Sequence, residues 1–112
     1  EKPWGFFEVL LESETSKVKI LSINSGQKLS LQMHEHRAET WYITQGVATV
    51  TKSDEVIELY PGESITIQRK EKHRIENIHD EVLEIIEIQT GSYFGEDDII
   101  RFDDIYGRKD FH

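Results

Sequence analysis

Histidine, glutamine and glutamate side chains gather in one short stretch of this chain, and a further histidine lies beyond it. His34 and His36 are two residues apart, Glu39 follows them, and His73 comes later. If the first stretch is a strand, its side chains alternate between two faces, so Gln32, His34 and His36 point to the same side. Three such side chains on the inner face of a small domain are costly to bury unless something binds them. A metal ion is the simplest occupant of that face.

The elements that must position these residues have the pattern of strands. Short runs rich in β-branched and aromatic residues recur about every 8–12 residues, and turn residues at 24–26, 45–46 and 61–62 separate them. No ten-residue stretch in the body of the chain has a clear helical period. About nine short strands separated by turns predict an all-β sandwich or barrel.

Alternation along each strand predicts which side chains share a face. On the first two strands Phe7, Val9 and Leu11 alternate with polar residues, as do Val18, Ile20 and, less regularly, Ile23. On a later strand His73, Ile75 and Asn77 share one face, which can bring His73 opposite the first histidine group. The acidic run 96–98 ends the strand pattern. We therefore predict one domain over residues 1–112, with residues 91–112 as a C-terminal arm.

Composition narrows the kind of metal site and the kind of partner. The chain has 112 residues, which suits one domain, and a formal net charge of −9, which repels nucleic acid. There is no cysteine, so a divalent metal would be held by nitrogen and oxygen ligands; zinc, manganese, iron, cobalt and nickel all stay open. No membrane-length apolar run or signal-peptide pattern is present, so we expect no membrane contact and a cytoplasmic location.

The first group of residues resembles the first motif of the cupins, a family of small metal-binding β-barrels. In that motif a glycine is followed by a His-x-His pair, a glutamate and a second glycine at fixed spacing. The residues that match this spacing are Gly26, Gln32, His34, Glu39 and Gly46, with glutamine in place of the first histidine.

The second cupin motif matches around His73. Gly62, His73 and Asn77 keep its spacing, whereas Gln68 and Lys70 stand where the family has proline and glycine before the histidine. That departure affects the turn before His73 rather than the position of His73 itself. Two motifs at compatible spacing imply a cupin barrel, also called a double-stranded β-helix or jelly roll.

The cupin resemblance implies a set of metal ligands. They are Gln32, His34, Glu39 and His73. Gln32 is favoured over His36 because it occupies the position of the first cupin histidine, and His36 then lies beside the metal or faces the substrate. If His36 is the ligand instead, three histidines and a carboxylate would suit a different cupin enzyme, such as a metal-dependent oxygenase.

Segments spread over nearly the whole chain are similar to the type II phosphomannose isomerase cupin. They are residues 3–5, 29–34, 36–41, 72–77 and 91–101. In that family this cupin is often the C-terminal domain of a bifunctional enzyme that begins with a mannose-1-phosphate guanylyltransferase. The resemblance implies a metal-dependent isomerase that interconverts mannose 6-phosphate and fructose 6-phosphate. The expected partner is therefore a small sugar phosphate.

Under this resemblance, three residues take part in catalysis. His36 or Glu96 would be the base that moves a proton between C1 and C2, and both candidates stay open. Arg37 would hold the phosphate, because its planar fork donates two parallel hydrogen bonds. Lys72, Arg74 and Arg101 could join it, although alternation places Arg74 opposite to His73, outside the site.

A second function is also compatible with the sequence. The chain could be a non-catalytic metal- and sugar-binding module, or the detached partner domain of a sugar nucleotidyltransferase. Thr40 stands where the isomerase family usually carries another histidine, and this departure favours the module. Exposed strand edges and the terminal arm predict a homodimer under either function.

Overall fold

The computed structural model describes residues 2–95 and 97–102, and this part of the chain is built from strands and turns. Ten strands are present, where about nine were expected. They are β1 (Gly5–Glu12), β2 (Ser16–Ile23), β3 (Gln32–Met33), β4 (Arg37–Gln45), β5 (Ala48–Lys52), β6 (Glu55–Leu59), β7 (Ser64–Ile67), β8 (His73–Glu76), β9 (Leu83–Gly91) and β10 (Ile100–Arg101). Within the described residues there is no helix that is long and apolar enough to cross a membrane.

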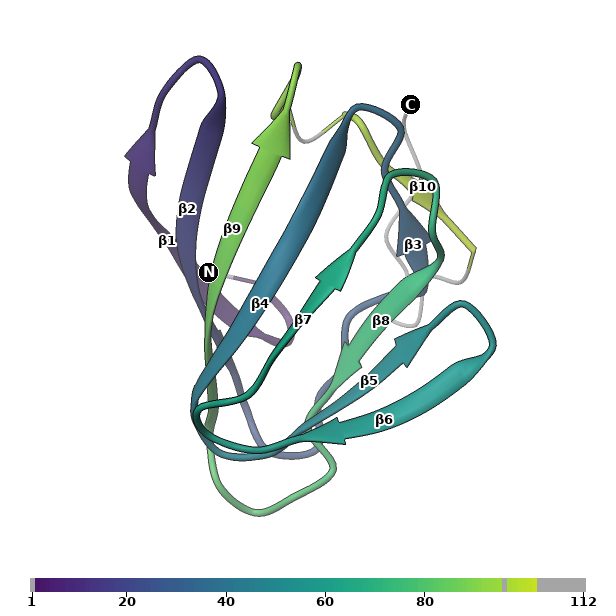
Figure 1. Cartoon of the computed structure of the whole chain (residues 1–112). Helices are drawn as coiled ribbons and strands as arrows, with labels where there is room; N and C mark the ends of the chain where they lie inside the picture. The colour runs from purple at the N-terminus through teal and green to yellow at the C-terminus, as the bar shows by residue number, and fades with distance from the viewer. Residues whose placement is uncertain (1, 96, 103–112) are drawn as a thin grey trace.

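Two five-stranded antiparallel sheets face each other across the core (Figure 1). Their strand orders are β1-β2-β9-β4-β7 and β10-β3-β8-β5-β6. Consecutive strands such as β4 and β5, or β7 and β8, belong to different sheets, so the chain winds from one sheet to the other. This winding is that of a double-stranded β-helix, and it confirms the predicted all-β cupin fold.

Inward-facing side chains alternate along the strands and fill the space between the sheets. His73, Ile75 and Asn77 are all buried, which confirms the face predicted for them. Asn77 closes the turn after β8: its amide donates to the carbonyls of Ile23 and Glu81. Because these hydrogen bonds satisfy a buried amide, Asn77 has a structural role at this end of the barrel.

Alternation on β1 and β2 does not separate the inner face from the outer one. Lys19, Leu21 and Ile23 face the core, whereas Val18 and Ile20 are only partly buried on the outer face. On β1 the alternating residues Val9 and Leu11 are exposed, and the register with β2 shifts between them. The sheet carries apolar side chains on both faces here, so a hydrophobic pattern alone does not say which face is inner.

The turn before β8 keeps a left-handed residue without glycine. Lys70, which stands where the cupin motif has glycine, has a φ of 64°. Its amide donates to the carbonyl of His34 at 2.7 Å, so the turn is tied directly to the first histidine group. A side chain with a Cβ in this conformation is strained by about 1–2 kcal/mol relative to glycine.

Replacing Lys70 with glycine should therefore stabilise the domain. We expect a gain of about 0.5–1 kcal/mol, because the relief of left-handed strain exceeds the extra chain entropy that glycine loses on folding. Thermal unfolding followed by circular dichroism measures the gain as a rise in Tm. The matched control is Arg69→Gly at the preceding residue, which has no positive φ and should lower Tm. A lower Tm for Lys70→Gly would show that the turn stores no such strain.

The segment after β9 returns to the second sheet. β10 pairs with β3, with Ile100 opposite Met33 and Arg101 opposite Gln32, and the amide of Phe102 donates to the carbonyl of Leu31 at 2.7 Å. The first half of the predicted arm thus covers the edge of β3 (Figure 1). Residues 103–112 lie outside the described part, and the predicted homodimer stays a prediction.

Candidate metal centre

Three buried side chains from the two sheets converge between them. His34 follows β3, Glu39 lies on β4 and His73 begins β8. One ligand atom from each residue lies within 4.8 Å of the other two, and each side chain is no more than 4% exposed. Two imidazole nitrogens and a carboxylate oxygen at this separation are a donor set for a divalent metal such as zinc, manganese, iron, cobalt or nickel.

Both imidazole rings are oriented by backbone carbonyls. Nδ1 of His34 donates to the carbonyl of Asp98, and Nδ1 of His73 donates to that of Glu71 at 2.9 Å. Each Nε2 then faces Glu39, at 3.4 Å for His34 and 3.6 Å for His73. Metal-binding histidines commonly have this arrangement, because a hydrogen bond at one nitrogen fixes the tautomer and leaves the other nitrogen as the ligand.

Burial keeps both rings neutral. Desolvation, followed by the charge of Arg37, lowers the pKa of His34 to about 4, and desolvation likewise lowers the pKa of His73. A neutral imidazole is the form that binds a metal. The donor set, the tautomers and the protonation states therefore all fit a metal ion between these three residues.

Arg37 is part of this cluster. Its side chain is 5% exposed; Nε donates to Oε2 of Glu39 at 2.9 Å, and Nη2 lies 3.2 Å from Nε2 of His34. The guanidinium supplies the buried carboxylate with a positive partner. The sequence placed Arg37 close to the metal site, and the structure shows direct contact; its predicted role in holding a phosphate stays a prediction.

Gln32 and His36 lie in different surroundings. Gln32 is the cross-strand partner of His73, and it lines the same cavity as His73 and Glu39. His36 is exposed, because β3 ends at Met33 and the chain bends before β4, so the predicted alternation does not reach it. The expectation that His36 shares a face with His34 is wrong. His36 opens instead to a separate hollow beside Tyr93.

Asp98 holds the bend that turns His36 outward. Its carboxylate accepts hydrogen bonds from the amides of Glu35 at 3.1 Å and His36 at 2.9 Å. The same residue's carbonyl holds His34. Gly91 lies opposite Arg37 and makes room for this bend: a Cβ there would come within 2.2 Å of the carbonyl oxygen of His36. The sequence analysis assigned the acidic run to the arm over residues 91–112 and did not predict that Asp98 is buried here.

If Gln32 is the fourth ligand, removing its amide should weaken metal binding more than removing His36. We expect Gln32→Ala to raise the Kd for the metal by about tenfold or more, and His36→Ala to leave it close to the wild-type value. Competition with a chromogenic chelator measures both constants. The reverse ranking would move the ligand set to three histidines and a carboxylate.

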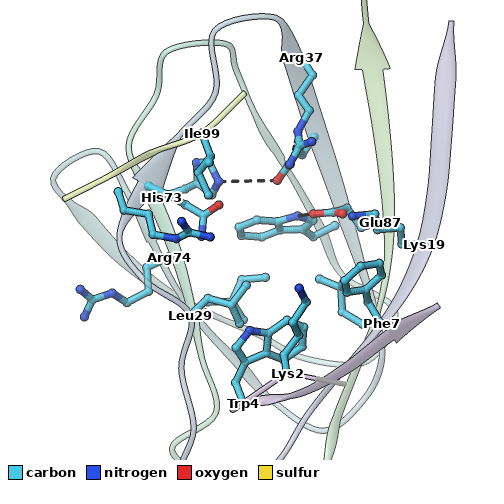
Figure 2. A pocket seen from close by; sticks show the side chains of 16 residues that line it. Lys2, Trp4, Phe7, Lys19, Leu29, Arg37, His73, Arg74, Glu87 and Ile99 are labelled. Carbon is cyan, nitrogen blue, oxygen red and sulfur yellow. Dashed lines mark hydrogen bonds and ion pairs between the residues drawn. The ribbon is translucent and has the colours of Figure 1, made fainter. Parts of the chain in front are cut away.

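A cavity opens from the cluster between the two sheets, and Figure 2 shows the side chains that line it. Its polar and charged lining residues are Lys2, Lys19, Gln32, Arg37, Glu39, His73, Arg74, Glu87 and Arg101. The predicted cations Arg74 and Arg101 are among them, but Arg74 alternates with His73 on β8, and Figure 2 shows its guanidinium directed away from the cavity, as expected. Lys72 is exposed and lies over the ring of Phe102 at 4.4 Å. Glu96, the other predicted base, lies outside the described residues.

Lys19 and Glu87 are inner-face charges that sequence reasoning missed. They are cross-strand partners on β2 and β9, and Glu87 is also the partner of Trp41 on β4. Both are buried, at 3% and 6% exposed. The signal was present in the sequence: Glu87 is in phase with Leu83 and Ile85, so alternation along β9 places it inside.

The surroundings of Glu87 stabilise its protonated form relative to a glutamate side chain in water. Oε2 accepts from the indole Nε1 of Trp41 at 3.1 Å, and Oε1 accepts from the amide of Gln89 at 2.8 Å. Desolvation, together with the charge of Glu39, raises the pKa of Glu87 to about 7, and the charge of Lys19 opposes that rise. The protonated acid and the carboxylate form of Glu87 are therefore both populated near neutral pH.

The chain is similar to longer proteins of sugar metabolism. It is 46% identical over 107 residues to the xanthan biosynthesis protein XanB of Xanthomonas campestris pv. campestris (strain B100), covering 96% of this chain and 23% of that protein. It is 43% identical over 107 residues to the mannose-1-phosphate guanylyltransferase ManC of Salmonella typhimurium (strain LT2), covering 96% and 22%. The chain thus spans less than a quarter of the length of these relatives.

The fold is shared with solved structures. A conserved protein with a double-stranded β-helix domain from Klebsiella pneumoniae superposes with a TM-score of 0.78 at 20% identity, over 90% of this chain and 81% of that one. The family model described as "Mannose-6-phosphate isomerase C-terminal" matches residues 1–104. The cupin barrel, the His34, Glu39 and His73 cluster and this match agree. The chain belongs to the mannose-6-phosphate isomerase C-terminal family.

Proposed function

We propose that this chain is a metal-dependent aldose–ketose isomerase that interconverts mannose 6-phosphate and fructose 6-phosphate. The observation that carries the proposal is a cavity in which a buried cluster able to hold a metal lies beside buried acid and base groups and several cations. Membership of the mannose-6-phosphate isomerase C-terminal family supports this substrate pair.

Each part of the cavity suits one part of such a substrate. A divalent metal held by Gln32, His34, Glu39 and His73 would polarise the sugar carbonyl and stabilise the negative charge that develops on its oxygen. Arginine binds phosphate well, since its fork donates two parallel hydrogen bonds. Arg37 and Arg101 line the cavity of a chain whose net charge is −9, so they would supply the local positive charge that a phosphate needs.

One side of the cavity is apolar. Trp4, Phe7 and Leu29 line this side, and Figure 2 shows them across the cavity from Arg37. An apolar wall excludes water from the reacting carbons and strengthens the electrostatic interactions at the carbonyl. The cytoplasm, where sugar phosphates are made and used, is the compartment that suits this activity.

A second candidate function is a non-catalytic binding module that serves a sugar nucleotidyltransferase. The observation that favours it is the difference in length: the chain covers less than a quarter of the length of relatives such as the guanylyltransferase ManC. Under this alternative the cavity would bind metal and sugar phosphate without turnover.

A coupled assay on metal-loaded protein separates the two functions. The chain is stripped with a chelator, reloaded with each candidate metal in turn, and incubated with mannose 6-phosphate while fructose 6-phosphate is detected. The isomerase predicts turnover that depends on the metal and stops when the chelator is restored. Binding of mannose 6-phosphate by calorimetry, with no product from any metal form, would leave the module as the function.

A further inference from the structure

We propose that Glu87 is the catalytic carboxylate that moves the proton between C2 and C1 of the sugar, a role that rests on the isomerase function proposed above. Among the described residues that line the cavity, the carboxylates are Glu39 and Glu87. Glu39 accepts a hydrogen bond from Arg37 and belongs to the metal cluster. His36 opens to a different hollow. Glu87 is thus the described carboxylate of the cavity that lies outside the metal cluster and is able to act on the substrate.

Trp41 connects Glu87 to the cluster. The indole ring of Trp41 contacts the ring of His73, with centroids 5.5 Å apart, while its Nε1 donates to Glu87. One indole therefore separates the carboxylate from a metal-ligand imidazole. Glu87 also lines the cavity that opens from the cluster, and Figure 2 shows it beside Lys19 on the cavity wall.

Gln89 can serve both protonation states of Glu87. Its amide nitrogen donates to the carboxylate, and its own oxygen is buried without a hydrogen-bond partner among the described residues. A flip of this amide would turn the oxygen toward Glu87 to accept the proton of the carboxylic acid. A base that must become an acid within one turnover needs a neighbour of this kind, because an unsatisfied buried O–H is costly.

The proton transfer balances without any other reactant. The Glu87 carboxylate takes the proton from C2 of the open-chain aldose; the C–H electron pair forms the C1–C2 double bond, and the carbonyl pair moves to O1. The hydroxyl proton passes from O2 to O1. Glu87 then returns its proton to C1, and the electrons on O2 form the ketone carbonyl. The carboxylate is regenerated, and one hydrogen has moved from C2 to C1.

Glu87→Gln keeps the shape of the side chain and removes its basicity. The flipped Gln89 amide can accept from the new amide, so we expect the variant to fold with wild-type Tm. We expect kcat to fall by at least about 100-fold, the usual contribution of a general base. Metal content and the calorimetric Kd for mannose 6-phosphate should stay unchanged. Exchange of the C2 hydrogen into deuterated water, read by NMR, should stop.

The matched control is Glu84→Gln on the same strand. Glu84 lies outside the cavity and accepts from Thr44, so its loss should leave kcat at the wild-type value. Glu87→Asp, which keeps a base one methylene further away, should recover part of the lost rate. Wild-type turnover combined with an active, exchanging Glu87→Gln variant would overturn the role of Glu87 and leave the isomerase standing. A wild type that neither converts nor exchanges the sugar would remove both.

A chemical label gives a readout that does not depend on turnover. An epoxide spanning C1 and C2 of a hexitol 6-phosphate is attacked by a carboxylate at that position, which opens the ring and forms an ester. Peptide mass spectrometry of the labelled protein should find the ester on Glu87, and mannose 6-phosphate should protect against it. A label on any other carboxylate would overturn the assignment.

Discussion

Replacing His73 with alanine should remove the metal and the isomerase activity together. His73 contributes one of the three buried donors, and its ring is fixed by Glu71 so that Nε2 faces Glu39. Loss of a residue that merely orients a ligand costs about 10–100-fold in metal affinity, so loss of the ligand itself should cost at least about 100-fold. Elemental analysis after gel filtration should show near-stoichiometric metal in wild type and almost none in the variant.

A histidine away from the cavity controls for this change. His79 lies in the turn after β8, with its side chain 41% exposed and paired with Glu58. His79→Ala should keep the wild-type metal content. Circular dichroism checks that His73→Ala is still folded, and His73→Gln, which fills more of the space, serves if it is not. Stoichiometric metal in a folded His73 variant would rule out the proposed ligand set.

Replacing Arg37 with methionine should destabilise the metal-free protein by about 3–5 kcal/mol, the usual cost of removing one member of a buried ion pair. Arg37 and Glu39 are 5% and 2% exposed and 2.9 Å apart, so the variant leaves a buried carboxylate without this partner. Urea unfolding in the presence of a chelator measures the free energy of unfolding. With metal added the loss should shrink, since the cation gives Glu39 another positive partner.

The control for Arg37 is Arg69→Met on the surface. Arg69 is exposed in the turn before His73, and a surface substitution of this kind usually changes the free energy of unfolding by less than about 0.5 kcal/mol. Equal losses in the two variants, or the same loss for Arg37→Met with and without metal, would contradict a shared role of Arg37 and the metal in stabilising Glu39.

Local alternation predicted part of this molecule well. His73 and Ile75 on β8 and Asn77 just after it face inward as expected, because a short strand bounded by turns keeps its phase. On β2 the alternating residues Val18 and Ile20 lie on the outer face, whereas Leu21 and Ile23 are buried. Both faces of that sheet carry apolar side chains, and only the pairing of β2 with β9 decides which face is inner.

The His34, Glu39 and His73 cluster was predicted better than its surroundings. His34, Glu39 and His73 come together as the spacing indicates, since two motifs fix them relative to the barrel. Glu87 was missed, because a charged residue in a strand is normally read as facing solvent. Its buried carboxylate accepts hydrogen bonds from Trp41 on β4 and Gln89 on β9, and Lys19 on β2 is its cross-strand partner.

The bend at residues 34–36 shows a second reason why local sequence patterns did not predict the whole site. The outward turn of His36 depends on Asp98, which lies more than sixty residues later in the chain. No local sequence pattern around His36 contains that contact, so the predicted strand was continued to His36, whereas β3 ends at Met33. The same segment brings Arg101 beside Gln32 through the pairing of β10 with β3.

The approach to equilibrium from both sugars tests the isomerase most directly. Metal-loaded wild type is incubated separately with mannose 6-phosphate and with fructose 6-phosphate, and NMR follows the ratio of the two. An isomerase brings both samples to the same ratio, and the chelated protein leaves each sugar as it was. Two samples that keep their starting sugars with every candidate metal would contradict the isomerase.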